Sequence, residues 1–217
     1  MIIRKGQAPV VHADEEDARY HGPSELLPLA DVGGLTQFGA HLHTLQPGTR
    51  SSDRHWHEAQ DEFLYVISGE ATVIEEDGPH PLHPGDAACW PAGAANAHHV
   101  VNRSESPCSF LIFGTRVLPD VIHYPDQREI LYDFEDGSSR RERNDGTLIE
   151  ELRTFEDGSW QLQRADGTLI KAGKAVRGLD QGQEGPGEPR GRMRRTNEWG
   201  LRSVLCTRLP HARPVTY

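Results

Sequence analysis

Short apolar runs separated by turn-forming residues dominate the chain from Leu35 to Thr115. Segments such as Gln46-Pro47-Gly48 end the runs, because glycine tolerates a positive φ and proline presets the first residue of a turn. The runs recur about every ten residues and no long amphipathic helix interrupts them. This pattern predicts an all-β fold, a sandwich or a barrel. The predicted strands are Phe38–Leu45, Glu62–Ser68, Ala71–Glu75, Ala87–Trp90, His98–Asn102 and Ser109–Thr115.

An internal repeat with an offset of 21 residues follows these strands. Phe134–Ser138 returns as Phe155–Ser159, and the Asp-Gly-Thr-Leu-Ile run at 145–149 returns at 166–170. Each copy contains Asp-Gly pairs, which are a strong signal for hairpin turns. We therefore expect a small β-meander. Two copies are too few for a solenoid, and we interpret the meander as a structural appendage rather than as an oligomerisation or lid element.

The chain divides by composition into four parts: an irregular N-terminal lead-in (1–34), a barrel (35–118), the β-meander with its repeat (119–175), and a Gly/Pro/Arg-rich tail (176–217). The tail has no apolar periodicity, so we predict that it is disordered. The net charge of −10 combines about −16 over residues 1–170 with about +6 over the rest. The tail also dilutes the hydrophobic fraction, which is only 35%.

The acidic balance argues against nucleic acid and membrane surfaces as partners. The chain has no run of 18 apolar residues that could form a transmembrane helix. The first residues, Met1 to Gly6, lack the apolar stretch of a secretory signal, and the three cysteines form no even, closely spaced framework. We therefore expect a cytoplasmic protein.

Histidine and carboxylate side chains gather in two of the predicted strands and their loops. His55 and His57 are two residues apart, so their imidazoles leave the same face of an extended chain. Glu62 begins the next apolar strand, and the segment around His98 and His99 offers another imidazole. Three imidazoles and one carboxylate that converge inside a barrel make a site for one divalent transition metal ion, Fe, Mn, Ni, Cu or Zn, with positions left for substrate or water.

The two segments resemble the two signature motifs of the cupin superfamily. The first reads Gly48-x6-His55-x-His57-x4-Glu62-x6-Gly69, one residue longer than the pattern between the first glycine and the first histidine. The second reads Gly85-x5-Pro91-x-Gly93-x4-His98-x3-Asn102, with a spacer before the histidine that is two residues longer. The resemblance covers about residues 35–115 and implies a double-stranded β-helix, the cupin jelly-roll barrel, often dimeric, with the metal in its bore.

The resemblance also implies the ligand set. His55, His57 and Glu62 fall on the ligand positions of the first motif, and His98 falls on that of the second when counted back from Asn102. Counted forward from Gly93, Asn96 takes that place, and His99 is a further alternative. We prefer His98, because it shares a face with Val100 and Asn102 whereas His99 points to the other face.

We expect a substrate pocket around this site and two classes of function. The expected pocket residues are Phe63, Trp90, Asn102, His41 and His43. In the first class the protein is an enzyme of dioxygenase, isomerase or cyclase type, and Glu62 also acts as a base. In the second it is a sensor or binding cupin without turnover, because the fold does not settle activity. The expected partners are a small molecule and a second copy of the chain in a homodimer.

Overall fold

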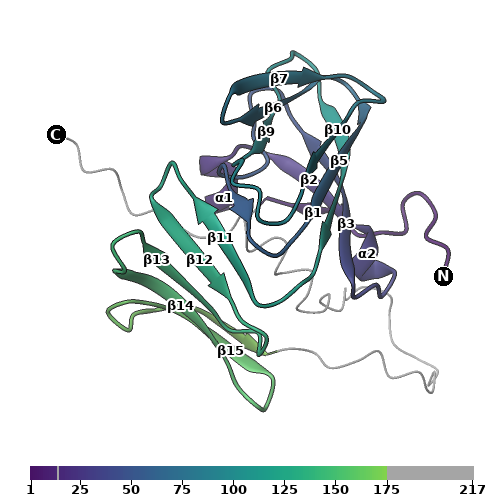
Figure 1. The fold of residues 1–217 in the computed structure, drawn as a ribbon. Coiled ribbons are helices and arrows are strands. Elements are labelled where there is room, and N and C mark those ends of the chain that lie inside the picture. Colours follow the sequence, from purple (N-terminus) through teal and green to yellow (C-terminus); the bar gives the residue numbers. More distant parts are fainter. Residues whose placement is uncertain (14, 175–217) are drawn as a thin grey trace, which may run out of the picture.

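The computed structural model of the chain describes residues 1–13 and 15–174 (Figure 1). The predicted all-β fold is confirmed, because strands form nearly all of its regular structure. Two short helices, α1 (Glu15–Tyr20) and α2 (Leu29–Val32), occur in the described residues. Neither is long or apolar enough to cross a membrane. The predicted disordered tail, 176–217, lies outside the described residues.

A six-stranded antiparallel sheet forms one wall of the barrel, in the order β1-β2-β3-β10-β5-β8. A three-stranded sheet, β7-β6-β9, faces it. Leu64, Val66 and Phe110 lie in the core between them and are fully buried. The strands of these sheets are β1 (Val11–His12), β2 (Ser24–Pro28), β3 (Phe38–Leu45), β5 (Glu62–Ser68), β6 (Ala71–Glu75), β7 (Gly78–Leu82), β8 (Ala87–Trp90), β9 (His99–Val101) and β10 (Cys108–Thr115).

The N-terminal segment corrects one expectation. Residues 1–34 are not an irregular lead-in, because β2 pairs along β3 with Leu26 opposite His43, and β1 pairs with β2. The run Ser24–Pro28 is too short to show a strand periodicity in the sequence. It forms a strand because it pairs with the free edge of β3. Helix α2 then packs beside β3 and buries Ala30.

Strand β7 was also missed, because it contains Pro79 and Pro81. Proline cannot donate to a sheet, but an edge strand tolerates it. Among the described strands β7 pairs with β6 alone, at the edge of its sheet.

The meander is a seven-stranded sheet in the order β16-β15-β14-β13-β12-β11-β4 (Figure 1, green). Its Asp-Gly turns place Gly137, Gly146, Gly158 and Gly167 at positive φ. The last strand, β4, belongs to the first histidine motif, with His57 opposite Ile122 of β11. The meander is therefore joined to the candidate site. Its strands are β4 (Trp56–His57), β11 (Asp120–Tyr124), β12 (Glu129–Asp133), β13 (Ser139–Arg143), β14 (Leu148–Thr154), β15 (Ser159–Arg164) and β16 (Leu169–Lys174).

Candidate metal centre

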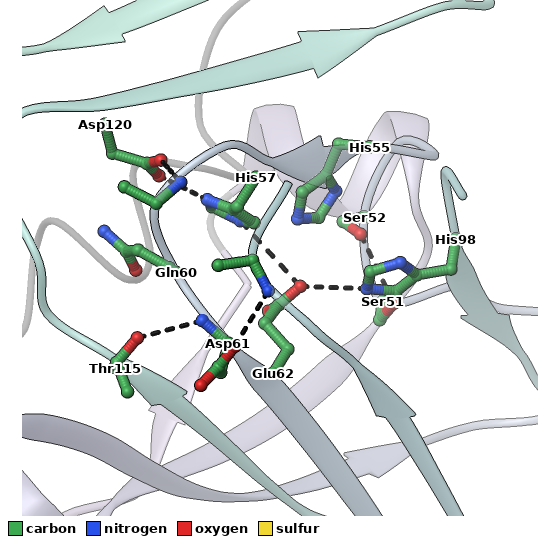
Figure 2. A network of polar contacts seen from close by, with 12 residues as sticks. Ser51, Ser52, His55, His57, Gln60, Asp61, Glu62, His98, Thr115 and Asp120 are labelled. Carbon is green, nitrogen blue, oxygen red and sulfur yellow. Dashed lines mark hydrogen bonds and ion pairs between the residues drawn. The ribbon is translucent and has the colours of Figure 1, made fainter. Parts of the chain in front are cut away.

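The structure brings His55, His57, Glu62 and His98 together (Figure 2). His57 lies in β4 and Glu62 begins β5, so the turn between these strands brings the carboxylate back toward the imidazoles. His55 forms an isolated antiparallel bridge with His98, which sets these two side chains side by side. All three histidines are less than 10% exposed.

The distances between the four side chains suit a single ion. Ligand atoms of His55, His57 and Glu62 lie within 4.8 Å of one another. Glu62 Oε2 lies 2.9 Å from His98 Nε2 and 3.8 Å from His57 Nε2. The ring centroid of His55 lies 5.2 Å from that of His57 and 5.6 Å from that of His98.

Each imidazole is oriented by an oxygen that accepts a hydrogen bond from its Nδ1. This contact leaves the Nε2 lone pair for a metal, and such outer partners are a usual feature of metal-binding histidines. Figure 2 shows the three rings turned toward the Glu62 carboxylate. The acceptors are the Asp53 carbonyl for His55 (2.8 Å), the Asp120 carboxylate for His57 (2.6 Å) and the Asn96 carbonyl for His98 (3.1 Å).

Burial and charge set the protonation of the site. Burial lowers the pKa of His55 to about 4, although Glu62 opposes the shift. Burial would also lower the pKa of His57, but Glu62 and Asp120 together raise it above its usual value. Burial alone would raise the pKa of Glu62, yet the surrounding imidazoles hold it far below its usual range. Glu62 is therefore an anion.

The donor set fits a divalent transition metal. With Nδ1 of His98 donating to a carbonyl, a neutral ring would point its Nε2 lone pair at Glu62 Oε2, only 2.9 Å away. Two acceptors that face each other at this distance need a cation between them, either a proton or a metal ion. Three imidazole nitrogens and a carboxylate oxygen suit Fe, Mn, Ni, Cu or Zn.

Comparisons with known proteins agree with this architecture. The profile of the Cupin_2 family, described as a cupin domain, matches residues 41–114. A crystal structure from Silicibacter pomeroyi, described as a sugar phosphate isomerase from a cupin superfamily, is 34% identical with a TM-score of 0.63. The match covers 69% of this chain and 96% of that one. The chain belongs to the cupin superfamily.

Two further relatives are similar to this cupin. A crystal structure from Acidithiobacillus ferrooxidans, described as a proposed sugar phosphate isomerase, is 31% identical with a TM-score of 0.55, over 65% of this chain and 86% of that one. Protein SchB of Streptomyces halstedii is 28% identical over 119 residues, which are 54% of this chain and 86% of that protein.

The two alternatives to His98 lie elsewhere in the cupin. His99 turns away from Glu62, and its Nδ1 contacts the Ser52 carbonyl at 2.9 Å. The Asn96 side-chain oxygen accepts a hydrogen bond from the Glu76 amide at 3.3 Å. His98 is thus the residue of this segment that contacts Glu62, and its role as a ligand is part of our proposal.

Three of the expected pocket residues have other surroundings. Trp90 stacks on His98 with ring centroids 3.7 Å apart and donates through Nε1 to Glu75, so it holds the imidazole. Phe63 follows Glu62 in β5 and therefore lies on the opposite face, where it is 37% exposed. Asn102 is fully buried and donates to the carbonyls of Leu45 and Ser106. A substrate contact by Phe63 or Asn102 stays a prediction.

His41 and His43 lie on the inner face of β3, toward the bore. Their strand partners in β10 are Ile112 and Phe110, and the His43 ring lies 5.3 Å from that of Phe110. Burial lowers the pKa of both imidazoles, that of His43 to about 4. The structure thus places both imidazoles beside the barrel core, and their role in a substrate pocket stays a prediction.

Sequence reasoning missed Asp120. Its Oδ2 holds His57, and its Oδ1 accepts a hydrogen bond from the Ala59 amide at 2.8 Å. Asp120 begins β11, well outside both motifs. A single aspartate at the start of a strand carries no local signal, so only the pairing of β4 with β11 reveals it.

Proposed function

We propose that this cupin is a metal-dependent enzyme for a small organic molecule, with His55, His57, Glu62 and His98 as ligands of one divalent transition metal ion. The arrangement of the imidazoles supports this most directly. Each Nδ1 contacts an oxygen, so each Nε2 is left for the ion. A site whose residues are oriented in advance binds a metal without reorganising.

Among dioxygenase, isomerase and cyclase chemistry, we favour isomerisation of a hydroxy-carbonyl compound. The relatives described as sugar phosphate isomerases, at 34% and 31% identity, support this choice. The bound metal would supply Lewis-acid polarisation of a carbonyl. Glu62 would take a proton from the carbon beside that carbonyl and return it to the carbonyl carbon, while the hydroxyl proton passes to the carbonyl oxygen, so that no oxidant or second reactant is needed.

A binding cupin without turnover is the second candidate. The lowered pKa of Glu62 favours it, because a carboxylate that is held as an anion by three imidazoles is a weak proton acceptor. The same four residues would then hold a metal that fixes a ligand. The cytoplasmic location and the homodimer expected from the sequence stay predictions under either function.

The test combines metal analysis with proton exchange. We expect purified protein to hold about one equivalent of metal per chain, as four ligands around one ion require. The double variant His55→Ala/His57→Ala should lose the ion, and His83→Ala, on an exposed loop, should keep it. A double variant that retains a full equivalent would refute the site.

Activity is then assayed with aldoses and ketoses, both with and without a terminal phosphate, in deuterium oxide. An isomerase incorporates solvent deuterium at the carbon beside the carbonyl, and NMR detects this exchange before product accumulates. We expect exchange with the wild type and with His83→Ala, and none with the double variant. Metal-loaded protein that binds these compounds without exchange would be a binding cupin.

A further inference from the structure

Three buried polar side chains meet on the inner face of the six-stranded sheet. His41 extends from β3, Arg116 follows β10, and Asp31 lies in α2. Arg116 forms an ion pair with Asp31 and also donates to the Leu35 carbonyl at 3.0 Å. A Cβ placed on Gly39 would lie 3.1 Å from His41 Nε2 and 3.7 Å from the Arg116 guanidinium. The imidazole and the guanidinium therefore lie together over Gly39.

This cluster shares a face with the metal centre. Gly39 pairs with Gly114 of β10, and Gly114 pairs with Glu62 of β5. Directly paired residues share a face of the sheet, and a Cβ on Gly114 would lie 3.8 Å from Glu62 Cγ. The two glycines carry no side chain, so the row from Gly39 to Glu62 is bare, next to the row of His41, Ile112 and Leu64. Two strand spacings, roughly 10 Å, separate the backbones of Gly39 and Glu62. Because His41 Nε2 lies over Gly39, this is a span for a ligand of four or five carbons.

Polar atoms of the cluster lack partners among the described residues. Both ring nitrogens of His41 and Oδ2 of Asp31 are buried without a hydrogen bond there. His41 is only 5% exposed. Buried polar groups are normally satisfied by protein, water or ligand. A neutral imidazole offers one donor and one acceptor, and the carboxylate oxygen offers an acceptor. A group that both donates and accepts is needed to satisfy them.

We propose that His41 and Asp31, with Arg116 holding the carboxylate, form a hydroxyl-binding subsite for the far end of a substrate bound at the metal centre. This inference rests on the proposed function. A hydroxyl group donates to Asp31 Oδ2 and accepts from the imidazole N–H. A phosphate or carboxylate fits poorly, because Asp31 would repel it and Arg116 is already paired. An alkyl group would leave all three polar atoms without partners. The subsite therefore selects polyhydroxylated compounds.

The test compares two acids with the same metal-binding end. D-erythronate and 2-hydroxybutyrate both carry an α-hydroxycarboxylate, but only erythronate has further hydroxyl groups. Their dissociation constants are measured by calorimetry on zinc-loaded full-length protein. We expect the wild type to prefer erythronate by at least about tenfold, a typical effect of a few charge-assisted hydrogen bonds. His41→Phe and Asp31→Asn should reduce the preference to less than about twofold, with the affinity for 2-hydroxybutyrate unchanged.

Two controls separate the subsite from folding and from the metal. His12→Phe changes an exposed histidine of β1 and should keep the wild-type preference. Circular dichroism and zinc content check each variant, and the isosteric Asp31→Asn remains informative if His41→Phe does not fold. Saturation-transfer NMR with erythritol and 1,4-butanediol on zinc-free protein tests the subsite without the ion. Erythritol alone should give a signal, and only in the wild type and His12→Phe.

The outcomes distinguish the two proposals. Equal binding of both acids by zinc-loaded wild type, or a preference that survives in both variants, overturns the subsite and leaves the metal centre standing. Absence of zinc binding together with an erythritol signal that depends on His41 overturns the proposed function and supports the subsite. No erythritol preference in any form of the protein also overturns the subsite.

Discussion

The three imidazoles of the candidate metal centre differ in how far away their Nδ1 acceptors lie along the chain. His55 and His98 each use a backbone carbonyl two residues earlier, so their orientation comes with the local loop. His57 instead uses the carboxylate of Asp120, 63 residues away. The acceptor of His57 is therefore the one of these three that a side-chain substitution, at Asp120, can remove.

Replacing Asp120 with alanine should lower metal affinity by about 10- to 100-fold, the usual cost of losing an outer partner of a ligand histidine. The His57 ring would lose the acceptor that fixes its tautomer and direction. Competition with a chromophoric chelator measures the effect. Asp126→Ala is the matched control, because Asp126 pairs with Arg54 at the surface. Equal affinities for the two variants would contradict the role of Asp120.

His43 should make the fold sensitive to mild acid. Burial, helped by nearby His41, lowers its pKa from 6.5 to about 4 in the folded protein. Between these two values the unfolded chain binds a proton that the folded chain does not, so the free energy of unfolding falls as pH drops from 6.5 toward 4. Above pH 6.5 this contribution is fully present.

Urea unfolding at pH 7.5 and pH 5 tests this expectation. The wild type should lose about 2 kcal/mol more than His43→Phe over this interval, because the variant has no imidazole to protonate. All other titrating groups are common to both proteins and cancel in the comparison. Equal losses for the two proteins would show that His43 is protonated alike in both states.

At the scale of elements, the turn between β5 and β6 packs closely against the start of β10 through Gly69. Gly69 has a φ of +73°, and a Cβ there would lie 2.5 Å from the Pro107 carbonyl oxygen and 2.8 Å from Cys108 Cα. Both neighbours are backbone atoms at the start of β10, so they cannot move without shifting the strand. Gly85, at a φ of +100°, has nothing within 4 Å of its Cβ position.

Both glycines have a positive φ, but only at Gly69 would a Cβ also overlap other atoms. Alanine variants at the two positions therefore separate the cost of backbone strain from that of steric overlap. Gly85→Ala should destabilise the protein by about 1 kcal/mol, the cost of a side chain at positive φ. Gly69→Ala should cost about 1–3 kcal/mol more, because β10 must also yield. Chemical denaturation of both variants gives the comparison. Equal destabilisation would mean that the turn relaxes away from Pro107 at no cost.

At the scale of the whole molecule, the meander reaches the candidate metal centre through β4, and the His55–His98 bridge lies just before this strand. His57 pairs with β11 through Ile122, which is fully buried next to Tyr124 and Leu131. The Tyr124 ring in turn lies 5.5 Å from that of His55 and 4.5 Å from the Arg141 guanidinium of β13. An ion bound by His55 and His57 would therefore also hold the meander against the barrel.

Zinc added to metal-stripped protein should raise the melting temperature by about 5–10 °C when its free concentration is near 100 times the dissociation constant. Only the folded state gathers the four ligands, so binding adds directly to stability. Differential scanning calorimetry measures the shift. The His55→Ala/His57→Ala protein should not respond. A similar rise in both proteins would indicate zinc bound at other places.

Much of the barrel was predictable because its signals are local. The β3 and β5 ranges agree with the predicted strands to the residue, since apolar runs and glycine turns lie next to each other in sequence. Alternation along the chain also indicated that His98 and His99 face opposite ways. The strand β2 and the proline-containing β7 were not predictable, because each forms by pairing with the free edge of a neighbouring strand and has no strand signal of its own.

The sequence by itself determined the all-β class, the positions of most barrel strands and the residue types of the candidate metal centre. Periodicity, turn chemistry and motif spacing act over a few residues and are visible in a single chain. Only the tertiary structure showed that Asp120 orients His57 and that Asp31, 85 residues before Arg116, lies beside the inner face of the barrel. Such contacts depend on which strands pair and which faces pack, and no short-range pattern encodes that choice.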